Sequence, residues 1–336
     1  MKILYAVQAT GNGHISRAIT LLPYLRSYGD VDIFLSGDNC GLRLEIPVKF
    51  RSKGISLYYN ASGGLSYTKI ARNLRPLRVL RDIRSLPVTQ YDLVLNDFDF
   101  ITAAACARKG APCFHFGHQA SFASPLTPRA EPKDPVGELV LRRFARCKQA
   151  VGFHFKKYDH FIFPPVIKSA ILEATPRDLG YFTVYLPSFS EQVLAEKLKP
   201  LQQFRFQVFT RSTVTPRKAG HIQFMPVNSN LFNESLIHCS GIITGAGFET
   251  PAEALQLGKK IMVNPIKGQY EQACNAAALR DFGVPSITKI DGNFAARFLQ
   301  WVSQPAPARQ NFSGAAQLAL NYLFDQFATR QLWVPA

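Results

Sequence analysis

The chain has 336 residues, of which 47% are hydrophobic, so it holds ample material for a folded protein and more length than one core usually covers. Its longest apolar runs are too short to cross a bilayer, no signal peptide is recognisable, and the six cysteines are scattered without C-x-x-C spacing. These features argue against membrane-spanning, secreted and disulfide-stabilised proteins and predict a cytoplasmic protein. The net charge of +16 indicates an anionic partner, which could be nucleic acid, an acidic membrane surface or a phosphorylated substrate.

In the first half of the chain, short apolar strands alternate with helices. The strands are predicted at Lys2–Val7, Val31–Gly37, Tyr91–Leu95 and Pro112–Gly117, and the helices at Ile15–Tyr28 and Ile101–Lys109. Short buried strands separated by helices indicate parallel βαβ units with helices on both faces of the sheet.

The alternation pauses at a proline-rich stretch and then resumes. Residues 164–178 are predicted to link two domains, 1–163 and 179–315, and residues 316–336 to form a helix that packs back toward the first domain. Later strands are predicted at Tyr181–Pro187, Arg205–Thr210, His221–Val227, Gly241–Thr244 and Ile261–Pro265, with helices at Glu191–Leu198, from Glu249, and up to Phe282. The sequence therefore predicts an α/β protein of two Rossmann-like, doubly wound parallel-sheet domains that face each other across a ligand-binding cleft.

The segment Gly241–Asn275 carries the most specific motif. A buried strand ends at Thr244, the small-residue turn Gly245–Gly247 follows, and a helix begins near Glu249. Glycines let backbone N–H groups approach an anion, and a helix N-terminus adds partial positive charge. The turn therefore predicts a diphosphate site, although an ordinary strand-to-helix turn would look the same.

Polar side chains follow this turn in the order of the groups in a nucleotide sugar. Glu253 lies one helical turn after Glu249, where its carboxylate could accept hydrogen bonds from both ribose hydroxyls. Gln269, Glu271 and Gln272 follow the next strand, where they could bind hydroxyls of the sugar. Diphosphate, ribose and sugar contacts would then come from consecutive strand ends.

The pattern G-x-G-x-E-T-x-x-E-A-L-x-x-G-K…P…Q-x-E-Q-x-x-N-A resembles the donor-binding signature of two-domain (GT-B) nucleotide-sugar glycosyltransferases. The resemblance is to the group of the peptidoglycan N-acetylglucosaminyltransferase and the UDP-glycosyltransferases, and most to a bacterial and archaeal subgroup whose substrate it leaves open. The segment ATGNGHISRA (Ala9–Ala18) resembles the first glycine-rich loop of that group. The resemblance implies a UDP-sugar as co-substrate, no cofactor and no metal ion. The donor contacts expected are Gly11, Gly13, Gly245, Ala246, Gly247, Phe248, Glu249, Thr250, Glu253, Gln269, Glu271 and Gln272.

The same resemblance implies that His14 takes the proton from the acceptor hydroxyl and that Asp97 orients it. From the residues alone, His14 could instead cap or pack its helix, and Asp97 could cap the helix that follows its strand. Asp97 and Asp99 also spell D-x-D, the metal motif of the other large glycosyltransferase fold, but they lie in the acceptor half, away from the predicted diphosphate turn. His118 and Gln119 are expected to face the cleft and contact the acceptor or the donor, but His118 could equally be a loop histidine whose hydrogen bonds are satisfied within the protein.

Basic residues recur every three positions in the acceptor half. They are Lys69, Arg72, Arg75, Arg78, Arg81 and Arg84, with Ile70, Leu74, Leu77, Leu80 and Ile83 as a companion apolar strip. Pro76 is expected to kink or divide this helix. Such a stripe is often only a solvated face, but it also suits an anionic membrane surface or a phosphate-bearing lipid acceptor. Nucleic acid is not expected, because no nucleic-acid-binding module is present.

These features together predict an inverting, metal-independent glycosyltransferase that moves a hexose from a UDP-sugar to a hydroxyl of a cell-surface glycan or glycolipid. It would be cytoplasmic and could be peripheral at the inner face of the cytoplasmic membrane. The alternatives are a nucleotide-sugar 2-epimerase of the same fold, a sugar-binding regulator without activity, and an NAD(P)-dependent oxidoreductase. The oxidoreductase would use Gly11 and Gly13 as its fingerprint, but Ser16 stands where the third glycine is expected.

Overall fold

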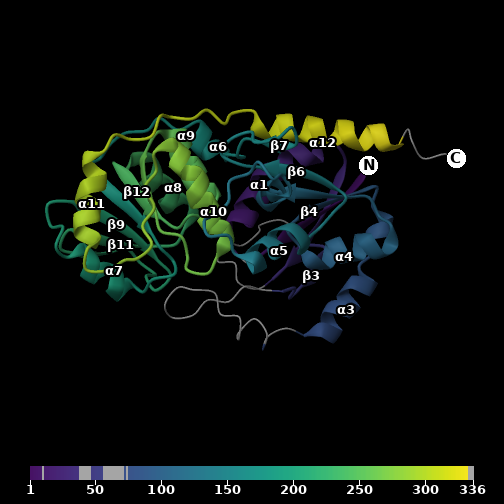
Figure 1. Ribbon diagram of the computed structural model, residues 1–336, viewed down its shortest axis with the longest axis horizontal. Coiled ribbons are helices and arrows are strands. Elements are labelled where there is room, and N and C mark those ends of the chain that lie inside the picture. Colours follow the sequence, from purple (N-terminus) through teal and green to yellow (C-terminus); the bar gives the residue numbers. More distant parts are fainter. Residues whose placement is uncertain (10, 38–46, 56–71, 73–74, 332–336) are drawn as a thin grey trace.

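The computed structural model describes residues 1–9, 11–37, 47–55, 72 and 75–331. These residues form two α/β units that lie side by side, and the strands within each sheet are all or mostly parallel (Figure 1). The first sheet has the order β3-β2-β1-β4-β5-β6-β7. Its strands are β1 (Lys2–Gln8), β2 (Asp30–Ser36), β3 (Phe50–Ser52), β4 (Leu93–Asp97), β5 (Cys113–Gly117), β6 (Gln149–Phe153) and β7 (Ile162–Phe163). All of its strand pairs are parallel, which confirms the α/β class expected from the alternation.

The second sheet has the order β10-β11-β9-β8-β12-β13, and only its edge pair β10–β11 is antiparallel. Its strands are β8 (Tyr181–Tyr185), β9 (Arg205–Thr210), β10 (Arg217–Ala219), β11 (Ile222–Pro226), β12 (Gly241–Thr244) and β13 (Lys260–Val263). Since the first sheet ends at Phe163 and the second begins at Tyr181, the predicted linker 164–178 lies between the two sheets.

Helices cover both faces of the sheets. They are α1 (Asn12–Arg26), α3 (Pro76–Ser85), α4 (Phe100–Lys109), α5 (Pro135–Arg143), α6 (Ser169–Leu172), α7 (Glu191–Leu198), α8 (Ser229–His238), α9 (Glu249–Leu257), α10 (Tyr270–Leu279), α11 (Phe294–Ser303) and α12 (Ala315–Gln331), with 3₁₀ turns at Val88–Gln90, His118–Ala123 and Arg280–Phe282. None of these described helices combines the length and apolar character needed to span a bilayer.

The last helix returns to the first domain. Figure 1 shows α12 (yellow) running along the top of the molecule over the lobe that holds β6 and β7. The ring of Tyr28, just after α1, stacks on Phe324 of α12 at 3.8 Å, and Phe163 of β7 packs against Tyr322. A single buried apolar cluster runs from the first sheet through α1, α9 and α12 into the second sheet. This shared core joins the two halves.

Pro76 divides the basic helical stretch, one of the two outcomes expected for it. Arg72 is helical, Arg75 is not, and Pro76 begins α3 at its first position, where the missing N–H of proline costs no hydrogen bond. Two details differ from what the sequence led us to expect. The strands β3, β7 and β10 were not predicted, since they have two or three residues each and lie at sheet edges. The interior strand β6, of five residues, was also not predicted. The cysteines are not all scattered: the sulfurs of Cys113 and Cys147 lie 2.9 Å apart, because β5 and β6 are neighbours.

Both sheets have a switch point, where chains leave neighbouring strands in opposite directions. In the first sheet it lies between β1 and β4, and in the second between β8 and β12. The carboxyl ends of strands at such a point leave a crevice in which α/β proteins bind ligands. Segments that follow these four strands are therefore the first place to search for a site.

Candidate active site

Two predicted catalytic residues meet at the switch point of the first sheet. His14 lies in the first turn of α1, directly after β1, and Asp97 is the last residue of β4. His14 Nδ1 lies 2.9 Å from Asp97 Oδ1, and the Asp97 side chain is fully buried. With Nδ1–H donated to the carboxylate, Nε2 is left to accept a proton. This geometry would allow His14 to act as a general base.

The charges around this pair favour an ionised carboxylate beside a basic imidazole. Burial opposes the charge of Asp97, but Arg17 and His14 outweigh it and lower the pKa of Asp97 to about 2. Burial likewise opposes the imidazolium of His14, but the Asp97 carboxylate outweighs this effect and raises the pKa of His14. A base with a raised pKa binds a proton more strongly, which favours proton abstraction.

The neighbouring Asp99 has a different task. Its carboxylate accepts a hydrogen bond of 2.6 Å from the Thr102 N–H and thereby caps α4. Phe98 between the two aspartates has a φ of 59°, a left-handed conformation rare for a bulky residue. Asp99, and not Asp97, is therefore the residue that caps α4. The two aspartates of the D-x-D pattern have different partners, since Asp97 contacts His14 and Asp99 contacts Thr102. Among the described residues, no cluster of three His, Cys, Asp or Glu side chains is arranged to hold a metal ion.

Sequence reasoning missed Arg17, which is central to the site. The residue is 3% exposed, and its guanidinium Nη2 lies 2.8 and 2.9 Å from the two oxygens of Asp97. Nη1 of Arg17 donates to Glu249 of α9, in the other domain. Two glycines make room for these groups: a Cβ on Gly13 would lie 2.4 Å from Glu249 Oε2, and one on Gly117 would lie 2.4 Å from Asp97 Oδ1. Gly13, predicted to contact the donor, therefore lies against Glu249.

The opposite wall of the site is the predicted diphosphate turn, Gly245–Gly247, between β12 and α9. No side chain caps the start of α9, where Phe248 stands in the N-cap position. Uncapped N–H groups at a helix start, with the helix dipole behind them, can bind an anion. Asn275 of α10 stabilises the turn, because its Nδ2 donates a hydrogen bond of 3.1 Å to the Ala246 carbonyl.

Of the other predicted donor residues, Glu253 and Gln272 are engaged within the protein. Glu253 is buried, and its Oε1 pairs with Lys168 of the segment between the sheets at 2.9 Å. Gln272 Oε1 accepts a hydrogen bond of 3.0 Å from the Ile266 N–H. Gln269 precedes α10, and its side-chain oxygen has no hydrogen-bond partner among the described residues. Thr250 follows Glu249 in the first turn of α9.

His118 and Gln119 come after β5 and face the second domain. His118 Nδ1 donates to the Phe153 carbonyl, its Nε2 lies 2.8 Å from Asn275 Oδ1, and its ring stacks on Phe248 at 4.0 Å. Gln119 Nε2 donates to Glu271 at 3.0 Å, whereas Gln119 Oε1 is buried without a partner in the described part of the chain. His118 therefore joins the two domains, and the Gln119–Glu271 pair retains capacity for a further hydrogen bond.

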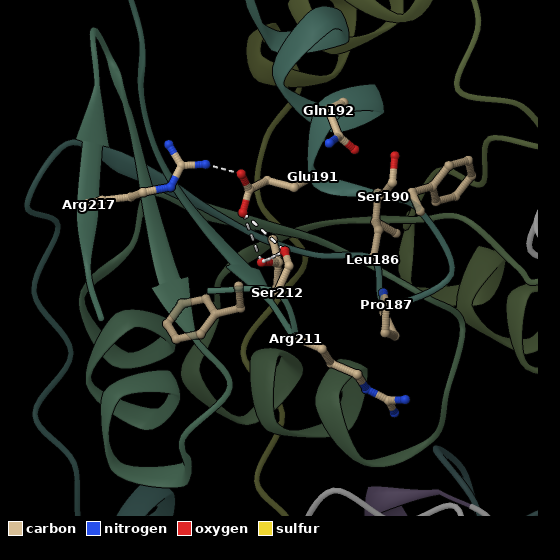
Figure 2. A pocket seen from close by; sticks show the side chains of 11 residues that line it. Leu186, Pro187, Ser190, Glu191, Gln192, Arg211, Ser212 and Arg217 are labelled. Atoms are coloured by element: carbon tan, nitrogen blue, oxygen red, sulfur yellow. Dashed lines mark hydrogen bonds and ion pairs between the residues drawn. The ribbon is translucent and has the colours of Figure 1, made fainter. Parts of the chain in front are cut away.

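A pocket of about 420 Å³ opens on the same edge of the second sheet, after β8 and β9 (Figure 2). Glu191 at the start of α7 accepts hydrogen bonds there from Arg217, from Thr213 at 2.9 Å and from Ser212 at 3.1 Å. Figure 2 shows Arg211 pointing away from this group. The pocket is lined by Leu186, Pro187, Phe189, Ser190, Glu191, Gln192, Phe209, Thr210, Arg211, Ser212 and Arg217. It flanks the switch point on the side opposite the Gly245–Gly247 turn.

The profile of one protein family, described as glycosyl transferase family 1, matches residues 1–303. The chain belongs to this family. It is thus a glycosyltransferase, and the family match favours transfer over the epimerase and oxidoreductase alternatives. No curated protein sequence matches the glycosyltransferase significantly.

Solved structures of glycosyltransferases share its GT-B fold. The glycosyltransferase is similar to UGT89C1 of Arabidopsis thaliana in complex with quercetin, at 13% identity and a TM-score of 0.63, covering 97% of this chain and 99% of that one. It is similar to a Polygonum tinctorium UDP-glucosyltransferase capable of glucosylating indoxyl, at 16% identity and a TM-score of 0.61, covering 97% and 98%. It is also similar to SnogD from Streptomyces nogalater, at 14% identity and a TM-score of 0.54, covering 96% and 99%. At these identities the likeness establishes the fold, as the sequence predicted.

Proposed function

We propose that this glycosyltransferase moves a hexose from a UDP-sugar to an acceptor hydroxyl, with inversion at the anomeric carbon and without a metal ion or other cofactor. The observation that carries the proposal is the buried His14–Asp97 pair at one switch point, facing the uncapped start of α9 at the other. An oriented base on one side and an anion-binding helix start on the other are the two parts that direct displacement requires.

In the proposed reaction, the acceptor oxygen attacks the anomeric carbon while its proton passes to His14 Nε2. The bond from that carbon to the diphosphate oxygen breaks, and its electron pair leaves with UDP. Asp97 stabilises the imidazolium that forms, through the 2.9 Å contact at Nδ1. The backbone N–H groups of the Gly245–Gly247 turn and of the first turn of α9 stabilise the leaving diphosphate.

The donor would lie along the carboxyl edge of the second sheet. With its diphosphate on the turn after β12, its base would extend toward the pocket after β8 and β9, which the strand order supports. Its ribose would bind Glu253 in place of the Lys168 ammonium. Its sugar would reach Gln269, the free acceptor of Gln119, and Glu271.

UDP is expected to stabilise the protein and NADH is not. At a concentration about 100 times its dissociation constant, a ligand specific for the folded state adds about 2.7 kcal/mol, which raises the melting temperature by several degrees. Thermal melts with UDP, NADH and no ligand measure the effect. A shift with NADH alone would remove the donor proposal. If UDP stabilises the protein, hydrolysis assays with UDP-, GDP- and TDP-sugars in the absence of acceptor would identify the nucleotide and the sugar.

We also propose that the acceptor is a lipid-linked or cell-surface glycan reached at the inner face of the cytoplasmic membrane. Lys69 lies outside the described residues, but four of the other basic residues, Arg72, Arg75, Arg81 and Arg84, are exposed. On α3, the apolar strip reaches the core only through Ile83, while Leu77 and Leu80 are 82% and 48% exposed. Exposed leucines among arginines fit an anionic bilayer surface.

Replacing Arg72, Arg75 and Arg78 by Glu is expected to reduce binding to anionic vesicles by about a hundredfold, since each surface cation contributes about 1 kcal/mol. Sedimentation with phosphatidylserine-containing vesicles measures the effect. The matched control replaces Lys199, Lys218 and Arg280, which are exposed in the second domain, and makes the same change in net charge. If both triple variants sediment like the parent protein, the stripe is only solvated surface.

A further inference from the structure

Arg17 occupies a position that general base catalysis by a His–Asp pair does not require. It lies one helical turn after His14 on α1, and its guanidinium fills the space between Asp97 of the first domain and Glu249 of the second. Desolvating an arginine is costly unless its hydrogen bonds are satisfied. Here they are satisfied by two carboxylates from different domains, one of which is the partner of the base.

We propose that Arg17 is a positioning residue for the transfer reaction, which fixes Asp97 against His14 and connects that pair to Glu249 on the donor side of the site. The inference rests on the proposed function and adds a residue to its machinery. Arg17 binds both oxygens of Asp97, through Nη2 at 2.8 and 2.9 Å and through Nε at 3.3 Å. A carboxylate held by two donor groups presents one defined oxygen to His14 Nδ1.

Arg17 also acts on His14 through its charge. Its Nη2 lies 3.2 Å from His14 Nδ1, so two proton donors face each other when the imidazole binds Asp97. The cation lowers the pKa of His14, while Asp97 and Glu249 raise it. Besides burial, which lowers it, the pKa of His14 therefore depends on one cation and two anions that meet beside the imidazole.

Four other titratable groups lie near His14. Burial raises the pKa of Tyr5, which keeps its hydroxyl protonated. Burial lowers the pKa of His115 to about 4 and that of His118 to about 3, so both are neutral around neutral pH. Burial also raises the pKa of Glu271, and its carboxylate interacts with His14 when it is ionised. The main charge effects on His14 itself are those of Asp97, Arg17 and Glu249.

The connection to Glu249 ties the base to donor binding. Glu249 begins α9 directly after the Gly245–Gly247 turn, and Gly13 permits the close approach of its carboxylate to α1. Arg17 therefore touches the residue that starts the helix on which the diphosphate would rest. Replacing Glu249 should change the behaviour of His14 although the two residues lie in different domains.

The test compares the pH dependence of kcat/KM in single variants. Because His14 must be neutral to act as a base, activity rises with pH through its pKa. Arg17→Gln removes the cation, so the midpoint of the rise in kcat/KM should move to a higher pH by about one unit. Glu249→Gln removes an anion, so this midpoint should move to a lower pH. Arg17→Lys keeps the charge but cannot bind both oxygens of Asp97 in the same way, so kcat should fall about tenfold or more while the midpoint stays unchanged.

A second measurement does not depend on turnover. NMR titration of the imidazole signals, with the His14 signal assigned by its absence in His14→Ala, should give the same opposite shifts for Arg17→Gln and Glu249→Gln. Arg26→Gln, which makes the same charge change at the exposed end of α1, serves as the control and should shift nothing. Glu249→Gln keeps the Arg17–Asp97 pair, so it tests the inference even if Arg17→Gln fails to fold.

The role of Arg17 would be overturned by unchanged midpoints in Glu249→Gln and in a folded Arg17→Gln, together with an unchanged kcat in Arg17→Lys. That result would leave the proposed function intact, provided that UDP still binds and transfer still proceeds. If the parent protein neither binds UDP nor transfers sugar, the proposed function fails, and the NMR titration still decides whether Arg17 and Glu249 control His14.

Discussion

His14→Ala is expected to lose transfer activity by a factor of about 10²–10⁴ while its affinity for UDP stays that of the parent protein. The acceptor hydroxyl would then lose its proton only to water. UDP would still bind, because its proposed contacts lie on the second domain, after β8, β9 and β12. Steady-state kinetics give the loss in kcat/KM, and calorimetric titration with UDP gives the affinity.

His160→Ala is the matched control, since it makes the same substitution at an exposed histidine of the first domain. It should retain activity and UDP affinity. A His14→Ala protein with unchanged turnover would take the base role away from His14. Loss of UDP binding together with activity would mean that His14 contacts the donor instead of the acceptor.

Asp97→Asn is expected to cost about 3–5 kcal/mol in the free energy of unfolding, because it removes one partner of a buried ion pair. Arg17 would keep its ion pair with Glu249, but its other partner would be an uncharged amide instead of the Asp97 carboxylate. The amide could also present an N–H to His14 Nδ1 and so favour the wrong tautomer, which should lower kcat as well. Denaturant titration at pH 7 measures the loss of stability.

Asp99→Asn provides the control two residues away. Asp99 is also buried, but burial raises its pKa, and asparagine caps a helix about as well as aspartate. This variant should cost less than about 1 kcal/mol. Equal losses for the two variants would show that Asp97 has no special partner in solution.

The pH dependence of stability separates these carboxylates further. The folded-state pKa of Asp97 is about 2, below its usual value of 3.8, so its contribution is fully present above pH 4 and is lost as the pH falls toward 2. The contribution is on the order of 2 kcal/mol. Asp97→Asn should lack this part of the acid-induced loss of stability. A stability profile parallel to that of the parent protein down to pH 2 would contradict the buried ion pair.

The sequence predicted much of the fold because the core strands are short, apolar and separated by clear turns. For β9, β12 and α7 the predicted and observed bounds coincide. The start of α1 was placed too late, at Ile15, because Asn and Gly are poor helix formers and hide the first turn. This error concealed that His14 lies inside the helix, one turn before Arg17.

The residues alone predicted the site only where they follow one another in the chain, whereas the His14–Asp97 pair, 83 residues apart, was expected from the family resemblance. The Gly245–Gly247 turn and α9 are contiguous, so their pattern was visible. Arg17 gives no local signal, because its partners Asp97 and Glu249 lie 80 and 232 residues away. Asp97 and Asp99 are equally plausible caps in sequence, and only the left-handed turn at Phe98 separates them.

The most direct test is a structure of the protein with UDP bound. We expect the diphosphate on the N–H groups of Gly245–Gly247 and the first turn of α9, the ribose at Glu253, and His14 Nε2 facing the open side of the diphosphate. A nucleotide held against Gly11 and Gly13, with nothing on the turn after β12, would contradict the account.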